Sequence, residues 1–250
     1  MKFRNAFFTI LLLVIVTGIS TNISAAQALE IEDIRSGKGI TAQPYAELEV
    51  HYRGWLKDGT LFDSSHERDK PFKFTLSVGQ VIHGWDIGIV GMTEGGIRIL
   101  RIPAKLAYGS RGAGKLVPPN ADLKFEVQLI KANIPPFISL NTEELTKKME
   151  SRIKVIDIRR EDEWTTTGVI PNAIQLTAFD KRGQFIASFP QQLKEYVSHD
   201  EEFALICRSG NRTARLVNWL ANKGGYPNAY NVLHGMNRWI TESRSIQSIN

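Results

Sequence analysis

The sequence predicts two domains, an α+β domain followed by an α/β domain with a parallel sheet. Its 250 residues are enough for two ordinary domains. Up to residue 133, apolar residues alternate with polar ones, as in half-buried strands. Beyond that point, continuous apolar runs alternate with helical patterns, as in strands covered on both faces. The change of period therefore marks a domain boundary.

Three alternating segments define the first domain, at residues 48–52, 72–76 and 123–129. Asp58-Gly59 is a hairpin turn signal after the first of them. Residues 84–92 predict one short helix. One helix against an antiparallel sheet is an α+β arrangement. We expect its first strand to begin near Ala46.

Paired prolines in Asn133-Ile-Pro-Pro136 predict a short, stiff linker. We place the first domain at 27–133, the linker at 134–137 and the second domain at 138–250. The elements predicted in the second domain are a helix opened by the capping box Asn141-Thr-Glu-Glu144, buried strands at 155–157 and 203–207, and a helix from Asn211 to Asn222 that stops at Gly224-Gly225.

The first 26 residues have the pattern of a signal peptide. Lys2 and Arg4 precede an apolar stretch at 6–19, and Ser24-Ala25-Ala26 provides small residues for cleavage. The stretch is shorter than the roughly 18 residues of a membrane-spanning helix. We therefore expect a periplasmic or secreted protein without stable membrane insertion after cleavage. An uncleaved anchor is the alternative.

Charge and histidine spacing exclude several function classes. The net charge of +5 falls to +3 once residues 1–26 are removed, and it is spread evenly, which argues against nucleic-acid binding. His51, His66 and His83 are isolated in the sequence, and no cluster has the spacing of metal ligands. We expect no metal and no cofactor.

The first domain is rich in aromatic residues but lacks a nucleophile paired with a base. It suits a reaction that needs an apolar pocket rather than acid/base chemistry. Rotation about an X-Pro peptide bond is such a reaction, with a barrier of roughly 18–20 kcal/mol. The twisted amide is less polar than the planar one, so a dry pocket favours the twisted state.

Six motifs in order carry a close resemblance. They are Tyr52-Arg-Gly54, Gly59-Thr-Leu-Phe-Asp-Ser-Ser65, Pro71-Phe-Lys-Phe74, Val81-Ile-His-Gly-Trp85, Ala107-Tyr-Gly109 and Pro118-Pro119. From residue 46 to 131 the chain resembles FKBP-type peptidyl-prolyl isomerases. The resemblance implies an enzyme that acts on proline-containing polypeptide clients.

The resemblance also implies roles for single residues. Trp85 would form the floor of the pocket. The walls would be Tyr52, Phe62, Phe72, Val81, Ile82 and Phe125. The Ile82 N–H and the Tyr108 hydroxyl would hold carbonyl groups, and Asp63 would lie at the edge. Leu116 and Val117 would overhang the site, whereas Phe74 and Leu76 belong to the core. The helical dimerisation segment of some secreted relatives has no room here, so we expect a monomer.

The second domain carries the single cysteine of the chain, Cys207, in the segment Cys207-Arg208-Ser209-Gly210-Asn211-Arg212. It follows an apolar run and opens a helix, so the thiol faces backbone N–H groups and the positive end of the helix dipole. These groups and the two arginines favour the thiolate, and Gly210 lets the loop close. Such a loop suits a nucleophile that carries an anionic group, and the two candidates are phosphate and sulfane sulfur.

This segment resembles the active loop of rhodanese-like sulfurtransferases. The supporting motifs are Val155-Ile-Asp-Ile-Arg159, Glu161-x-Glu-Trp164, Gly168-Val-Ile-Pro-Asn-Ala173 and Gly235-Met-Asn-Arg-Trp239. Four residues separate Cys207 from Arg212, the shorter spacing that favours a persulfide over a phosphate. Asp157 and Arg159 are either near the active face or structural.

Three functional hypotheses follow. The first is a prolyl isomerase for exported proteins joined to a sulfurtransferase that uses a small donor such as thiosulfate. The second is a periplasmic folding chaperone whose second domain binds partners without chemistry. The third is a thiol sensor in which oxidation of Cys207 modulates the isomerase.

Overall fold

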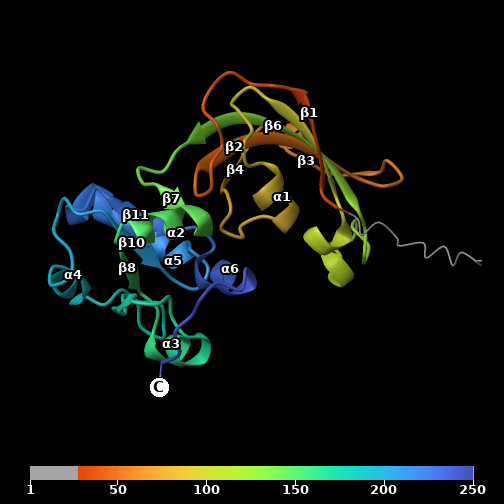
Figure 1. Ribbon diagram of the computed structural model, residues 1–250. Coiled ribbons are helices and arrows are strands. Elements are labelled where there is room, and N and C mark those ends of the chain that lie inside the picture. The colour runs from red at the N-terminus through yellow and green to blue at the C-terminus, as the bar shows by residue number, and fades with distance from the viewer. Residues whose placement is uncertain (1–27, 250) are drawn as a thin grey trace, which may run out of the picture.

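The computed structural model describes residues 28–249, which form two lobes that lie side by side (Figure 1). The predicted signal peptide lies outside these residues. Each lobe has its own sheet and its own hydrophobic core. No helix between residues 28 and 249 has both the length and the apolar character to cross a membrane.

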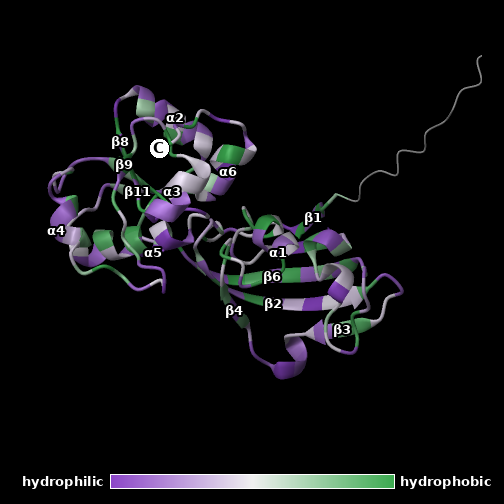
Figure 2. Ribbon diagram, turned by 90° about the horizontal axis from the view of Figure 1, so that it is seen from below, coloured by the Kyte–Doolittle hydropathy of each residue, from purple (hydrophilic) through white to green (hydrophobic). Residues whose placement is uncertain are grey.

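The first domain is an antiparallel sheet wrapped around one helix, which confirms the α+β prediction. The strand order is β1-β5-β6-β2-β3, with β4 also paired to β2. Figure 2 shows hydrophilic and hydrophobic residues mixed along β2 and β6, as half-buried strands require. The strands are β1 (Glu30–Arg35), β2 (Glu47–Leu56), β3 (Leu61–Ser64), β4 (Phe72–Thr75), β5 (Ile97–Ile102) and β6 (Leu123–Asn133).

Strand β1 begins well before the first strand that the sequence predicted. It pairs antiparallel with β5, from Glu30 opposite Arg101 to Arg35 opposite Ile97. All six of its residues are exposed. An edge strand that buries neither face needs no alternation of apolar and polar residues. The hydrophobic pattern therefore did not predict β1.

Helix α1 (His83–Gly88) packs against the sheet and ends four residues earlier than predicted. Arg98 of β5 explains part of this ending. Its guanidinium donates to the carbonyls of Gly88 at 2.8 Å and Val90 at 3.1 Å, and it is held by Asp33 of β1. These bonds satisfy carbonyls that a helix end leaves without partners.

The second domain is built on a five-stranded parallel sheet of order β7-β11-β10-β8-β9, as the apolar runs predicted. Its strands are β7 (Ser139–Leu140), β8 (Lys154–Asp157), β9 (Ile174–Gln175), β10 (Phe203–Ile206) and β11 (Ala229–Val232). The helices around it are α2 (Thr142–Glu150), α3 (Glu161–Thr167), α4 (Phe189–Leu193), α5 (Asn211–Trp219) and α6 (Gly235–Thr241).

Two predicted helix boundaries are present in the second domain. Asn141 Oδ1 accepts from the N–H groups of Glu143 and Glu144, and Glu144 Oε2 accepts from Asn141 N–H, so the capping box is complete. Helix α5 begins at Asn211 and continues as a π-helical turn to Gly224, before Gly225 at φ 77°. The left-handed glycine stops the helix there.

The junction between the domains is formed by 134–138, which lie in no helix or strand, and by contacts around them. Tyr45 of the first domain packs on Phe137 with ring centroids 6.1 Å apart. The Asn211 amide donates to the Val78 carbonyl at 3.3 Å. A groove of about 590 Å³ runs along the junction, and Tyr45, Pro136 and Asn211 are among its lining residues.

Candidate active sites

Five aromatic rings meet in the first domain around Trp85. Its ring contacts those of Tyr52, Phe125 and Phe72 edge-on, at centroid distances of 5.1, 5.2 and 6.2 Å. Phe62 packs edge-on against Phe125 at 5.6 Å. Edge-to-face pairs hold each ring in a fixed orientation. We call Tyr52, Phe62, Phe72, Trp85 and Phe125 the aromatic cluster.

Helix α1 places Trp85 at the centre of this cluster. Gly84 allows the close approach, because a Cβ at that position would clash with the side chain of Ile102. Trp85 is buried, and its indole N–H has no hydrogen-bond partner among residues 28–249. Phe72, by contrast, is 37% exposed. The cluster therefore offers an apolar surface with a buried base and an open side.

A polar group of three residues borders the cluster. The Tyr52 hydroxyl donates to Asp63 Oδ2 at 2.5 Å. Arg68 donates to Asp63 Oδ1 at 2.7 Å and to the Tyr52 hydroxyl at 2.8 Å. Burial opposes ionisation of Asp63, but the bonds from Tyr52 and Arg68 outweigh it and lower the pKa of the carboxyl. Burial and then Asp63 raise the pKa of Tyr52 to about 12.

Two further residues near the cluster, Ile82 and Tyr108, carry hydrogen-bond donors. Ile82 is the extended residue before α1, and its N–H donates to no acceptor in the described part of the chain. Tyr108 precedes a short 3-10 helix (Gly109–Arg111) and is 37% exposed. Burial, followed by the charge of Asp63, raises the pKa of Tyr108. Its hydroxyl is therefore protonated at neutral pH and able to donate.

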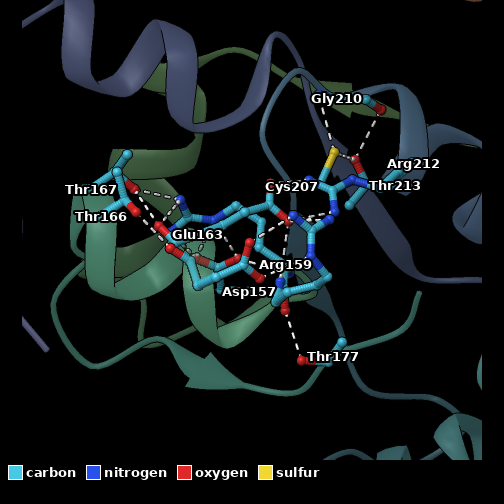
Figure 3. A network of polar contacts seen from close by, with 12 residues as sticks. Asp157, Arg159, Glu163, Thr166, Thr167, Thr177, Cys207, Gly210, Arg212 and Thr213 are labelled. Atoms are coloured by element: carbon cyan, nitrogen blue, oxygen red, sulfur yellow. Dashed lines mark hydrogen bonds and ion pairs between the residues drawn. The ribbon is translucent and has the colours of Figure 1, made fainter. Parts of the chain in front are cut away.

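In the second domain, Cys207 follows β10 and lies in a tight loop before α5 (Figure 3). The Gly210 N–H donates to Cys207 Sγ at 3.2 Å, and Thr213 Oγ1 lies 3.5 Å from the sulfur. Thr213 also donates to Asn231 Oδ1 of β11 at 2.6 Å. One backbone N–H of the loop therefore donates to the sulfur, and the Thr213 hydroxyl lies beside it. The thiol has no exposed surface.

Arg212 lies across the loop and is held by Glu163 of α3. Its guanidinium donates to both carboxylate oxygens, at 2.8 and 2.6 Å, a fork-to-fork pair shown in Figure 3. Burial works against the charge of Arg212, but Glu163 and Cys207 together raise its pKa. Arg212 is therefore a fixed cation beside the sulfur. Arg208 is exposed instead.

Comparisons with known proteins identify a family for each of the two domains. The family model described as "FKBP-type peptidyl-prolyl cis-trans isomerase" matches residues 38–130. The FK506-binding protein of Neisseria meningitidis serogroup A is 55% identical over 104 residues, which are 42% of this chain and 95% of that protein. The chain belongs to the FKBP-type peptidyl-prolyl cis-trans isomerases.

Other FKBP relatives span a wide range of organisms. FK506-binding protein 1 of Dictyostelium discoideum is 48% identical and covers 41% of this chain and 95% of its own. The peptidyl-prolyl cis-trans isomerase FPR2 of Saccharomyces cerevisiae is 51% identical, covering 36% and 68%. The crystal structure of AtFKBP13 is 41% identical, covers 42% and 93%, and has a TM-score of 0.40.

These relatives match the first domain alone, and a second family model covers the rest. The model described as "Rhodanese-like domain" matches residues 141–242. The chain is therefore a peptidyl-prolyl cis-trans isomerase with a rhodanese-like domain. The aromatic cluster belongs to the first of these domains and the Cys207 loop to the second.

The FKBP domain brings most of the predicted site residues together. Val81 and Ile82 pack on the core beside the aromatic cluster, and Val117 is buried in the same core. Phe74 and Leu76 are buried, as predicted for core residues. Leu116 is not part of this core. It is 57% exposed and lies in the turn that the Ala113–Val117 bridge closes.

The fold brings together two histidines that are isolated in the sequence. The rings of His51 and His66 stack with centroids 4.7 Å apart, and His51 Nδ1 lies 3.0 Å from Ser65 Oγ. The hairpin of β2 and β3 brings them together across 15 positions in sequence. No group of three potential metal ligands occurs among residues 28–249.

Sequence reasoning missed several residues that support the sites. Arg68 has no repeat or motif that marks it, and it joins Tyr52 to Asp63 only through the fold. Thr213 and Asn231 lie in ordinary helix and strand patterns. Asp157 lies opposite Ile206, the residue before Cys207. Asp157 and Arg159 are fully buried and paired at 2.6 Å, and Arg159 also binds Gly168 O and Thr167 Oγ1. The pair is therefore close to the Cys207 loop and also holds the end of β8 to the end of α3.

Proposed function

We propose that the FKBP domain acts on X-Pro bonds of exported polypeptides. The observation that supports this is the aromatic cluster, which offers an apolar surface next to the Tyr108 hydroxyl and the Ile82 N–H. A proline ring on Trp85 would lose water, while the two donors hold carbonyl oxygens in the twisted geometry. Catalysis then needs no proton transfer, because the apolar site favours the less polar twisted amide.

The site of action is tested by finding the mature protein in cells. We expect N-terminal sequencing of protein from the periplasmic or secreted fraction to begin at Gln27. Recovery of a full-length chain from the cytosol would contradict an exported role. Clients can then be identified by crosslinking in the same fraction, with a Trp85→Leu variant as the control for binding at the aromatic cluster.

We further propose that the rhodanese-like domain is a cysteine-persulfide sulfurtransferase that uses a thiosulfate-type donor. The supporting observation is the Gly210 N–H bond to Cys207 Sγ, next to the fixed Arg212 cation. The thiol proton leaves to solvent, and the thiolate attacks the outer sulfur of thiosulfate. A bond forms from Sγ to that sulfur, the S–S bond of thiosulfate breaks, and sulfite leaves with its electron pair.

The second half-reaction returns the enzyme to its starting state. An acceptor such as cyanide attacks the terminal sulfur and leaves as thiocyanate, while Sγ recovers the electron pair as thiolate. Loop N–H groups and Arg212 stabilise the anionic sulfur in both forms. The test is thiocyanate production from thiosulfate and cyanide by the wild type and by Cys207→Ser. We expect production only by the wild type.

The alternative is a rhodanese-like domain that binds partners without chemistry. Its specific support is the complete burial of the Cys207 thiol, since a donor must reach the sulfur. The same burial argues against a thiol sensor, because redox-sensing cysteines are solvent-accessible. Absence of thiocyanate above the Cys207→Ser background, together with no persulfide on the wild type, would favour the binding module.

A further inference from the structure

Tyr45 belongs to the FKBP domain, but its side chain ends in the Cys207 loop of the other domain. A Cβ built on Gly210 would clash with the Tyr45 hydroxyl oxygen, so the hydroxyl contacts the residue whose N–H binds Cys207 Sγ. Burial raises the pKa of this phenol to about 12, and a negative charge on Cys207 would act in the same direction. A residue of one domain therefore lies within the sulfur-binding loop of the other.

The Tyr45 hydroxyl is buried and has no hydrogen-bond partner among residues 28–249. The side chain is 7% exposed. The Asn231 amide and the backbone N–H of His234 lie close enough to act on the phenol as donors to its oxygen, and they leave its proton without an acceptor. A buried donor without an acceptor destabilises the folded state, and such a group in a native protein needs an explanation.

The backbone of Tyr45 adds a second cost. Its φ is 67°, in the left-handed region that a bulky aromatic residue rarely adopts. The conformation is held by the bond from Tyr45 N–H to Leu76 O at 2.9 Å and by the packing of the ring on Phe137. Strain of this kind persists where the surroundings enforce it and is concentrated at functional sites.

We propose that Tyr45 is a positioning residue for sulfur transfer, whose hydroxyl donates to the terminal sulfur of a persulfide on Cys207. This inference rests on the proposed sulfurtransferase function. A persulfide adds one sulfur about 2 Å beyond Sγ and carries a negative charge. It supplies the acceptor that the buried hydroxyl lacks. The FKBP domain then completes the sulfur site of the rhodanese-like domain.

A coupling between the domains follows from this bond. If the persulfide binds Tyr45, loading Cys207 with sulfur strengthens docking of the FKBP domain on the loop. Docking of that domain must then favour the persulfide by the same factor in its equilibrium constant. Tyr45 also lines the groove at the junction. Tyr45 therefore contacts both the groove and the loop that holds the buried thiol.

The test uses the full mature chain, loaded with sulfur from thiosulfate or from inorganic polysulfide. The variant is Tyr45→Phe, which keeps the ring and removes only the hydroxyl. Tyr226→Phe is the matched control, since Tyr226 is also buried with an unpartnered hydroxyl but packs on Phe203, at the opposite end of β10 from Cys207. Mass spectrometry counts persulfide as a gain of one sulfur on Cys207.

Two readouts distinguish positioning from a merely structural role. We expect the pH midpoint for alkylation of the persulfide to rise in Tyr45→Phe by about one unit, a tenfold change, because a bond to the anion is lost. We also expect loading to raise the Tm of the wild type and of Tyr226→Phe, but not of Tyr45→Phe. Unloaded Tyr45→Phe should be at least as stable as the wild type.

The outcomes separate the two proposals. A wild type that loads, with Tyr45→Phe unchanged in both readouts, overturns the role of Tyr45 and leaves the sulfurtransferase standing. A wild type that accepts sulfur from neither donor overturns the sulfurtransferase and the role of Tyr45 with it. A shift in Tyr226→Phe equal to that in Tyr45→Phe also overturns the inference, since the effect is then not specific to the loop.

Discussion

The Tyr52 hydroxyl and the Asp63 carboxylate are joined by a hydrogen bond of 2.5 Å at the edge of the aromatic cluster. Arg68 binds both partners, so the three groups form a closed ring of bonds. The bond fixes the Tyr52 ring, which in turn contacts Trp85 and Phe72. The polar contacts of the Tyr52 hydroxyl with Asp63 and Arg68 thereby fix one ring of the apolar surface.

Tyr52→Phe is expected to slow isomerisation while the fold is kept. The ring remains in the cluster, but Asp63 loses one donor and the ring is no longer fixed by it. Loss of one such bond is worth about 1 kcal/mol, which corresponds to about a fivefold fall in kcat/KM. The measurement is the isomerisation rate of a proline-containing test peptide. Glu126→Gln, which breaks an exposed pair with Arg53, should leave the rate unchanged.

Trp85→Phe is expected to reduce kcat/KM by about tenfold, equivalent to about 1.4 kcal/mol of the barrier. The Trp85 ring contacts four other rings, those of Tyr52, Phe72, Phe74 and Phe125. A phenylalanine ring is too small to keep all of these contacts, so the base of the cluster is left incomplete. Trp55→Phe is the matched control, since Trp55 lies under Lys124 and away from these rings. Equal rates for both folded variants would show that Trp85 is only a core residue.

Asp157→Asn is expected to destabilise the rhodanese-like domain strongly. Asp157 accepts hydrogen bonds from the Nε, the Nη2 and the backbone N–H of Arg159 in a fully buried pair, and the change leaves the guanidinium charge uncompensated. Breaking one partner of a buried pair costs about 3–5 kcal/mol. Thermal or urea unfolding measures the loss. The surface pair of Arg160 and Asp162 gives the control, because Asp162→Asn should change the unfolding midpoint little.

The sequence was informative where residues follow a local period or a compact motif. Alternation found β2, β4 and β6, and the capping box located the start of α2. The loop from Cys207 to Arg212 could be predicted because its groups are consecutive. Strand β1 could not, since an exposed edge strand lacks a hydrophobic pattern.

Contacts between distant segments were beyond sequence reasoning. Arg68 reaches Tyr52 across 16 positions, and Tyr45 reaches the loop of Gly210 from another domain. Nothing local marks such residues, because their partners are chosen by the packing of whole elements. Tyr45 even appears unfavourable by itself, with a left-handed φ and an unpartnered hydroxyl. Residues that break local rules in this way are expected at functional sites.

The domain junction is expected to weaken in mild acid because of His234. This residue precedes α6 at φ 62°, and its neighbours in the junction are His83 and Asp86 of the FKBP domain and Arg238 of its own helix. Removal from water, followed by the charge of Arg238, lowers the pKa of His234. A histidine with a lowered pKa binds fewer protons when docked than when exposed. Neutral His234 therefore contributes to the stability of the junction at pH values above the ordinary histidine pKa of about 6.5. This stability is lost as the pH falls below that value.

We expect the Tm of the wild type to fall between pH 7.5 and pH 5.5, with a smaller fall in His234→Asn, because asparagine tolerates the left-handed backbone and does not titrate. His199→Asn is the matched control, since His199 stacks on Tyr226 away from the junction. An identical pH dependence in the wild type and His234→Asn would show that protonation of His234 does not control docking of the two domains.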